Sequence, residues 1–409
     1  MNIKKVILSL VILIAIIIGI VFLIKHRDYQ KNNPDVSNAI KGVVTSENVS
    51  IYSKPKESKK IEGMKLGENV YIIETVKESI DGTTREWYKV REVYEKKDKK
   101  GNVKKTFNKV GYILKSNVKY FELNTTSEYV LMSDVSKFDI INEKFKTPEE
   151  YEVYLLNHKF NYAYIRLGGR GYGDEGNFYT DPNYQIFIDA CNYLGVPYGL
   201  YYIDEATNEE ELDEEVEFVK DFISKMDADK KKMLCLPVCI DVEKYDKSVN
   251  ARTKNIWDER GELLQKLTDK FKENGIESII YSNGNMSSEY LDEVNADFWI
   301  AYYDREDKIP SIWVTDINWE KDDDESAEST ENEDENGQEE EEEEKEDNEE
   351  KFKYEHFTEN ELLVPKIVAW QFSNIGAKKD GITLKVDLSI VKNEFFQKFI
   401  SDKNINNQN

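Results

Sequence analysis

The chain contains, at residues 236–243, the stretch Leu-Pro-Val-Cys-Ile-Asp-Val-Glu. Its apolar first part predicts a buried β-strand, and two acids end that strand. Residues two apart in a strand point the same way, so Asp241 and Glu243 should face one side with Cα atoms roughly 6–7 Å apart. Burying a polar pair is costly unless it is compensated, which favours a functional role for these two acids.

Apolar runs of similar length recur on both sides of this stretch and alternate with helical patterns. Helix starts are marked by Thr147-Pro148, by Asp181-Pro182 and by a capping box from Thr207 to Glu210. Five βα units are followed by three further strands with little room for helices. This pattern predicts an α/β fold, an irregular (β/α) barrel over residues 129–400. The expected strands are 129–133, 162–167, 197–203, 235–241, 277–282, 298–302, 367–372 and 384–388.

Four acids, Asp134, Asp241, Glu243 and Asp387, fall at the ends of these strands. In such barrels the carboxyl ends of the strands share one face and carry the chemistry. A single acid there is more simply a helix cap or a loop residue, but four at converging ends favour a site. The three histidines are isolated from one another and from cysteines. Zinc hydrolases and Ser-His or Cys-His nucleophile sites are therefore disfavoured, and no metal or cofactor is expected.

Paired carboxylates suit glycoside hydrolysis. One protonated acid donates to the leaving oxygen, and a carboxylate or the substrate's acetamido group stabilises the sugar cation. Like charge and an apolar wall raise the pKa of one acid while its hydrated partner stays ionised. We assign Glu243, which has the longer reach, as the acid, and give Asp241 and Asp134 electrostatic and orienting roles.

These residues resemble glycoside hydrolase family 25, the Chalaropsis-type lysozymes or muramidases. The resemblance implies five βα units plus three strands, cleavage of the β-1,4 bond between N-acetylmuramic acid and N-acetylglucosamine, and Glu243 as proton donor with Asp134, Asp241 and Asp387 around it. Retaining and substrate-assisted mechanisms both stay open. The matching segments are Asp134-Val135-Ser136, Tyr164-Ile165-Arg166-Leu167-Gly168, Pro197-Tyr198-Gly199-Leu200-Tyr201, Asp241-Val242-Glu243, Ile280-Tyr281-Ser282, Trp299-Ile300-Ala301-Tyr302-Tyr303, Trp370-Gln371-Phe372-Ser373 and Val386-Asp387-Leu388.

The same motifs suggest residues that contact the substrate. Pyranose rings bury an apolar face against aromatic rings, although aromatics at strand ends are as often core residues. Two places depart from the family. Tyr202 stands where many relatives have histidine, and residues 181–187 replace an Asp-Pro-x-Phe-x-x-Asn pattern. We expect these changes to affect substrate fit more than the acid–base residues. The candidates for substrate binding are Tyr201, Tyr281, Tyr303, Trp370 and Arg166.

Residues 42–123 alternate short β-rich runs with turn clusters, which predicts a small antiparallel barrel. The order Asn-Val, Gly before an apolar strand, Trp-Tyr-x-Val and Gly-Tyr-Ile resembles bacterial SH3-like domains. Members of that family often hold an enzyme against peptidoglycan, so the stem peptide is an expected ligand. A spacer domain without its own ligand is the alternative.

Residues 6–24 form an uncharged apolar run of 19 residues, long enough at 1.5 Å per residue to cross a bilayer. No small-residue cleavage site follows, so an uncleaved transmembrane signal anchor is expected, with residues 1–5 as a cytoplasmic tail and 25–41 as a stalk. Flanking positive charges nearly balance. The extracellular placement of the bulk of the chain, at the cell membrane, therefore comes from the resemblance to cell-wall enzymes.

The net charge is −25, from 81 acidic and 56 basic residues, which disfavours nucleic acid as a partner. Residues 320–351 hold 20 acids and 3 lysines, so −17 of this charge lies there and −8 on the rest. Such a segment cannot offset the entropy of ordering, and we expect a disordered insertion in the larger domain. The three cysteines are too few and too far apart to suggest disulfides, and buried thiols are expected.

The sequence thus favours a membrane-anchored peptidoglycan hydrolase. A non-catalytic tether that binds cell-wall glycan is the alternative from another class of function. A glycosidase acting on chitin-like chains is a third possibility, distinguished by whether the substrate needs its lactyl group.

Overall fold

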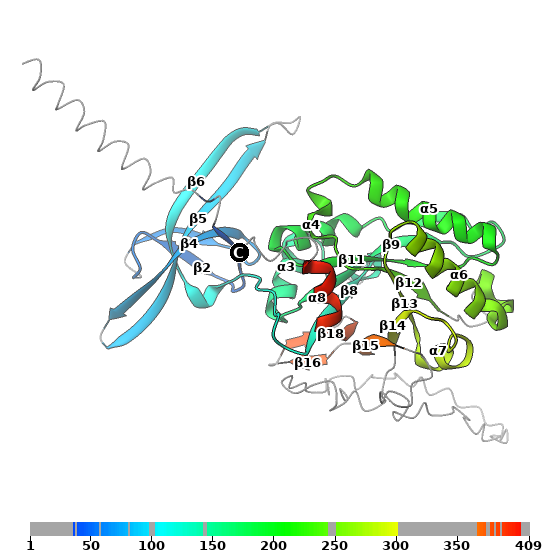
Figure 1. The fold of residues 1–409 in the computed structure, drawn as a ribbon. Helices are drawn as coiled ribbons and strands as arrows, with labels where there is room; N and C mark the ends of the chain where they lie inside the picture. Colours follow the sequence, from blue (N-terminus) through cyan, green and yellow to red (C-terminus); the bar gives the residue numbers. More distant parts are fainter. Residues whose placement is uncertain are drawn as a thin grey trace, which may run out of the picture.

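A computed structural model shows a small all-β domain and a larger α/β domain (Figure 1). In its described part, no helix is long and apolar enough to cross a membrane. The predicted anchor, Tyr303 and the acidic segment 320–351 lie outside the described residues. The described residues are 36, 39–56, 59–80, 82–97, 103–141, 145–243, 251–301, 366–373, 377–379, 382–384 and 387–401.

The small domain is one antiparallel sheet in the order β3-β2-β6-β5-β4-β1-β7. Alternate residues of its strands form a separate core that includes Val44, Ile51, Val70, Val90 and Ile113. The predicted antiparallel all-β unit is confirmed. The pairings of its described strands do not close it into the predicted barrel, and its SH3-like identity stays a prediction. Its strands are β1 (Ile40–Val44), β2 (Val49–Tyr52), β3 (Lys60–Met64), β4 (Asn69–Ile80), β5 (Thr83–Lys97), β6 (Val103–Leu114) and β7 (Val118–Lys119), with η1 (Lys115–Asn117) before β7.

The larger domain is built on a closed barrel of eight strands in the order β8-β9-β11-β12-β13-β14-β15-β18, in which β8 pairs with both β9 and β18. The predicted barrel is therefore confirmed. Its strands are β8 (Tyr129–Val135), β9 (Tyr162–Arg170), β11 (Tyr198–Ile203), β12 (Val238–Val242), β13 (Ser278–Asn283), β14 (Asp297–Ala301), β15 (Ile367–Ser373) and β18 (Leu388–Lys392). Three short strands add to it: β10 (Phe178–Thr180) pairs with β9, and β16 (Ala377–Lys379) pairs with β17 (Ile382–Leu384).

The eighth strand differs from the prediction. We expected it at 384–388, parallel and ending at Asp387, but β18 starts at Leu388 and runs antiparallel to both β15 and β8. Asp387 therefore precedes the strand. Because the strand is reversed, its start lies at the barrel end where the parallel strands finish, and Leu388 pairs with Ser133. Asp387 therefore lies at the expected end of the barrel, but at the start of its strand and not at the finish.

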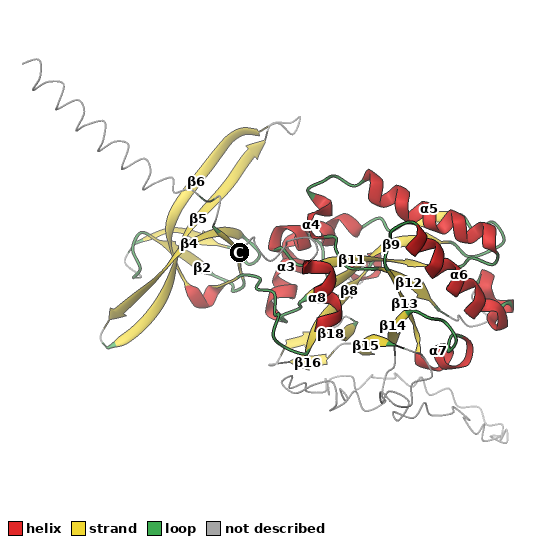
Figure 2. Cartoon of the chain, viewed as in Figure 1, coloured by secondary structure: helices red, strands yellow, loops and turns green. Residues whose placement is uncertain are grey.

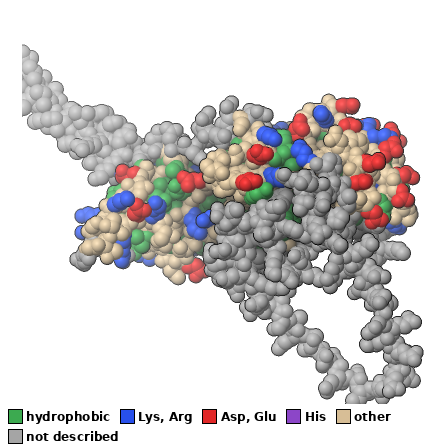
Figure 3. All heavy atoms as spheres, turned by 60° about the horizontal axis from the view of Figure 1, so that its bottom comes forward, with side chains coloured by type: hydrophobic (Ala, Val, Ile, Leu, Met, Phe, Trp, Pro, Cys, Tyr) green, Lys and Arg blue, Asp and Glu red, His purple; other side chains and the backbone are tan. Residues whose placement is uncertain are grey.

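Helices cover the outside of the barrel (Figure 2). A large apolar core lies between strands and helices, and a second core fills the barrel interior, where Phe396 of the last helix packs 5.3 Å from Tyr162, ring to ring. The helices are α2 (Lys137–Ile141), α3 (Pro148–Asn157), α4 (Tyr184–Leu194), α5 (Glu209–Lys225), α6 (Arg260–Glu273), α7 (Gly284–Tyr290) and α8 (Asn393–Ser401), with turns η2 (Lys230–Met233), η3 (Arg252–Asn255) and η4 (Trp257–Glu259). Acidic side chains crowd the end of this domain away from the small domain (Figure 3).

The helix starts follow the prediction in one of three cases. Thr147 caps α3 by accepting from the backbone N–H of Glu150. The box before α5 is shifted by one residue, because Asn208 is the cap and accepts from Glu211 N–H. Asp181 does not cap α4, which begins at Tyr184. Its carboxylate is used inside the barrel mouth instead.

Candidate active site

A cavity of about 700 Å³ opens at the carboxyl ends of the barrel strands. Strand alternation decides which side chains reach it, because every second residue points into the barrel. On β8 the inward series is Val130, Met132 and then Asp134, and on β12 Cys239 is followed by Asp241. Each strand thus starts in the apolar interior core and ends in a polar group at the cavity floor.

All four predicted acids line this cavity. Asp134 and Asp241 are buried, with 8% and 7% of their surface exposed, whereas Glu243 and Asp387 are half-buried. Pairing of Leu388 with Ser133 sets Asp387 beside the strand that carries Asp134. The structure therefore brings together acids that lie more than 250 positions apart in the chain, while their individual roles stay predictions.

Burial raises the pKa of Asp241 well above its ordinary value, and the nearby charges of Glu243 and Asp134 act in the same direction. The guanidinium of Arg166 opposes this rise. We expected crowding to raise the pKa of one acid and assigned that acid as Glu243, but Asp241 is the more buried member of the pair. The charge of Glu243 therefore acts on the ionisation of Asp241.

Arg166 ends the inward series of β9 and lines the cavity as predicted. Its Nε donates to Asp181 Oδ2 over 2.8 Å, and Asp181 is fully buried. The same oxygen accepts from the backbone N–H of Lys137 at 2.9 Å. Asp181 therefore fixes both the arginine and the start of α2. Sequence reasoning took this acid for a helix cap, and the Asp-Pro pair alone could not distinguish the two roles.

Gln371 is a site residue that sequence reasoning did not select. Its Nε2 lies 3.3 Å from each carboxylate oxygen of Asp134, and its Oε1 accepts from the hydroxyl of Tyr281 over 2.7 Å. This chain of contacts orients Asp134 from the opposite wall of the barrel. The only sequence signal was its place in the segment Trp370-Gln371-Phe372.

The predicted aromatic platforms divide. Tyr201 and Tyr281 are half-buried and line the cavity, as expected. Trp370 is 1% exposed and belongs to the core between barrel and helices, so it is not a platform. The reason is alternation, since Gln371 points inward and its neighbour must point outward. Tyr303 lies outside the described residues.

Tyr202, one of the departures from the family pattern, also points away from the cavity. It is fully buried against the helices, and its hydroxyl lies 3.2 Å from Glu215 Oε2 on α5. Its neighbours Tyr201 and Ile203 are the residues of β11 that line the cavity. Tyr202 itself therefore does not line the cavity, and the expected effect of this change on substrate fit stays a prediction.

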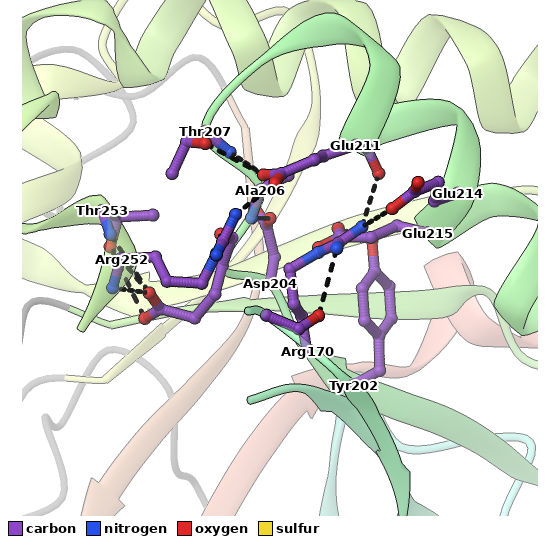
Figure 4. Close-up of polar contacts among 12 residues, drawn as sticks. Arg170, Tyr202, Asp204, Ala206, Thr207, Glu211, Glu214, Glu215, Arg252 and Thr253 are labelled. Atoms are coloured by element: carbon purple, nitrogen blue, oxygen red, sulfur yellow. Dashed lines mark hydrogen bonds and ion pairs between the residues drawn. The ribbon is translucent and has the colours of Figure 1, made fainter. Parts of the chain in front are cut away.

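A buried ionic network holds the loops around the cavity (Figure 4). Arg170 at the end of β9 donates to Glu215 at 3.1 Å and Glu214 at 2.9 Å, both on α5. Arg252 donates from its side chain to the carbonyls of Gly173 and Asp174 in the loop after β9. Its backbone N–H donates to Glu205, which follows β11. The loops after three neighbouring strands are thereby fixed to one another.

Another buried arginine supports the same loops. Arg260 of α6 pairs with Asp204, and both side chains are fully buried. The backbone N–H of Asp204 in turn donates to the carbonyl of Asp241 over 3.0 Å. Among the described residues, no group of three or more His, Cys, Asp or Glu side chains could hold a metal ion.

Comparison with known proteins agrees with this geometry. Residues 172–330 match the family model of Glycosyl hydrolases family 25. The larger domain is a glycoside hydrolase. The matched residues of the hydrolase include Asp241 and Glu243, whereas Asp134 and Asp387 join them through the fold. No curated protein sequence matches the chain.

Several solved structures are similar to the hydrolase. One is the catalytic domain of an endolysin from bacteriophage P40 of Listeria monocytogenes, with 14% identity, a TM-score of 0.41, and coverage of 68% of this chain and 98% of that one. Another is the spore cortex lytic enzyme SleM of Clostridium perfringens, with 20% identity, a TM-score of 0.37, and coverage of 66% of this chain and 69% of that one. A third is the autolysin LytC of Streptococcus pneumoniae in complex with a synthetic peptidoglycan ligand. It has 15% identity and a TM-score of 0.38, and the match covers 79% of this chain and 69% of that one.

Proposed function

We propose that the protein is a peptidoglycan muramidase that cleaves the β-1,4 bond between N-acetylmuramic acid and N-acetylglucosamine. The observation that carries the proposal is the meeting of Asp134, Asp241, Glu243 and Asp387 in one cavity. The match to a glycoside hydrolase family over residues 172–330 supports it, because that reaction needs closely placed carboxyl groups.

In this proposal Asp241 and Glu243 hold the catalytic proton. Asp241 is buried and its pKa is raised, which favours its protonated form. Glu243 is the half-buried member and delivers that proton to the glycosidic oxygen. Asp134, oriented by the amide of Gln371, faces the positive charge that develops on the sugar. Either the acetamido group of the substrate or a carboxylate completes the displacement.

The remaining parts of the chain fit the same proposal. The apolar run 6–24 would anchor the protein in the cell membrane, with the hydrolase on the outer face. The all-β domain at 42–123 would bind stem peptide as an SH3-like module and keep the hydrolase against the wall. The stalk, residues 25–41, would set how far the all-β domain and the hydrolase reach from the membrane.

The test uses the full chain in detergent, incubated with purified peptidoglycan. Mass spectrometry should find new fragments that reduce at muramic acid. Glu243→Gln should abolish them, while Glu277→Gln, the same change at the other end of a neighbouring strand, should leave them unchanged. A folded parent protein that sediments with glycan and releases no such fragments would favour the tether.

A further inference from the structure

Two exposed aromatic side chains border the active cavity and have no part in the proposed chemistry. Phe138 is 52% exposed and Tyr172 is 43% exposed, and both line the cavity wall. The other large hydrophobic side chains exposed in the described part of the chain, Ile40, Ile61 and Leu66, belong to the small domain. Exposed apolar surface gathered at a cavity mouth indicates a binding surface.

The extension of β9 builds this side of the mouth. The first half of β9 pairs with β8 through Ile165, and the second half, from Gly168 to Arg170, pairs with β10. The strand β10 therefore continues the wall above the end of β8, and its Tyr179 lines the cavity together with Phe138 and Tyr172. We call Phe138, Tyr172 and Tyr179 the aromatic rim.

The rim is held in place before any ligand arrives. The backbone N–H of Ser136 donates to Asp139 Oδ2 at 2.8 Å, and that of Phe138 to Ser136 Oγ at 3.2 Å. Asp181 holds the backbone of Lys137 from the side of β10. Because these contacts fix the backbone that carries Phe138, a ligand does not have to order that backbone when it binds.

Two cations lie against this apolar surface. The guanidinium carbon of Arg166 is 4.8 Å from the centre of the Phe138 ring. The ammonium of Lys137 is 5.2 Å from the same centre and 5.8 Å from that of Tyr179. Arg166 is only 5% exposed, and its Nη2 has no hydrogen-bond partner among the described residues. A buried guanidinium with an unused donor on a cavity wall is suited to a ligand oxygen.

Charges of both signs line the cavity. Its acids are Asp134, Asp139, Asp241, Glu243 and Asp387, and its basic residues are Lys137, Arg166 and Arg170. The cations of Lys137 and Arg166 are the ones that lie against the ring of Phe138. An anionic group on a sugar stacked against that ring is therefore attracted to these two cations.

We propose that the aromatic rim is a sugar subsite, and that Lys137 and Arg166 recognise the free lactyl carboxylate of an N-acetylmuramic acid that carries no stem peptide. The proposal rests on the muramidase function and adds the residues that select its substrate. The rings stack on the apolar face of the pyranose, while the two cations donate to the lactyl group.

The experiment measures binding by calorimetry with the full chain carrying Glu243→Gln, so that ligands stay intact. The ligands are peptide-free glycan fragments with free lactyl carboxylates and chitin fragments of equal length, which lack the lactyl group. Phe138→Ala and Tyr172→Ala should each weaken both ligands by about two- to tenfold, the range expected for one aromatic contact. Lys137→Gln should weaken only the lactyl-bearing ligand, and salt should reduce that preference.

Two matched controls test surface and charge. Leu66→Ala removes an equally exposed apolar side chain from the small domain, and Lys272→Gln removes a charge from α6. If the Phe138 and Lys137 variants bind the ligands with the same affinity as these controls, the subsite is overturned. Loss of both ligands alike in Lys137→Gln would overturn the recognition of the lactyl group. If the unmutated chain releases no muramic acid ends while the rim variants still lose affinity, the muramidase proposal fails and the subsite stands.

Discussion

At the scale of single residues, the site depends on which of two neighbouring acids is buried. Asp241 points to the barrel interior and loses its water, whereas Glu243 lies two residues further on at the opening. The carboxyl Oδ1 of Asp241 is buried and has no hydrogen-bond partner among the described residues. In its charged form, such a carboxylate lowers the stability of the folded state. A destabilising group of this kind indicates a functional position.

The first prediction concerns stability and pH. A raised pKa means that Asp241 stabilises the folded protein at pH values below its unfolded pKa, and that this contribution is lost as pH rises through the folded pKa. Asp241→Asn should therefore raise Tm at pH 7, by about 2–4 °C for each kcal/mol regained, while activity is lost. The gain should shrink toward pH 4. Differential scanning calorimetry across this range checks it, and a lower Tm at pH 7 would contradict it.

The second prediction concerns the contact chain from Tyr281 through Gln371 to Asp134. Tyr281→Phe keeps the ring and removes the hydroxyl that donates to Gln371. One hydrogen bond is worth about 0.5–1.5 kcal/mol, so kcat/KM should fall by about two- to twelvefold.

Tyr198→Phe is the matched control. It removes a hydroxyl that donates over 2.6 Å to the carbonyl of Lys230 at the opposite end of the barrel. It should lower Tm and leave kcat/KM unchanged on soluble glycan. If the two variants lower kcat/KM equally, the hydrogen bond from Tyr281 to Gln371 has no specific role in orienting Asp134.

At the scale of elements, strand alternation and helix caps were readable from sequence, and chain direction was not. The apolar run before Asp241 and the start of α3 at Thr147 were both found where predicted. A strand pattern is the same in either direction, so the reversal of β18 had no sequence signal. The aromatic platform at Trp370 failed for a related reason, because a motif does not state which of two neighbours faces inward.

The third prediction tests the shifted cap of α5. Asn208→Ala removes the side chain that accepts from Glu211 N–H and should cost about 0.5–2 kcal/mol. Glu210→Ala, in the position expected from the capping-box pattern, should be nearly neutral because that side chain is exposed. Urea denaturation followed by circular dichroism measures both. A larger loss for Glu210→Ala would restore the original assignment.

At the scale of the whole molecule, the small domain packs on the helices of the hydrolase. Lys41 of β1 lies 5.1 Å above the ring of Tyr193 on α4, and Lys119 donates to Asn157 at the end of α3. Between them Glu152 of α3 is 2% exposed. This interface had no signal in the sequence, since each of its residues is of a type common on protein surfaces.

The fourth prediction follows from Glu152. Burial, with the charge of Glu149, raises its pKa to about 8, while the Asn69 side chain and Lys41 on the small domain oppose the rise. Tyr193 and Cys191 of α4 are the other titratable groups close to it. Because the folded state favours the protonated form, the interface is stabilised below pH 4.5 and loses this contribution as pH rises through 8.

Hydrogen exchange should therefore show faster exchange in β1 and α3 at pH 9 than at pH 6, after correction for the intrinsic rate. Glu152→Gln should remove the difference, and Glu277→Gln, outside the interface, should keep it. A pH-independent exchange pattern in the parent protein would contradict the prediction.

Because β18 is antiparallel to its neighbours, the four acids of the site depend on two different parts of the structure. Asp134 and Asp241 lie at the ends of parallel strands, and Glu243 lies directly after one; the whole barrel determines the spacing of these strands. The fourth, Asp387, stands at the end of the connection that contains β16 and β17. Insertions or deletions in that connection can shift one carboxylate and leave the other three in place. Diversification of the enzyme, in nature or in the laboratory, can therefore adjust the fourth acid separately from the barrel.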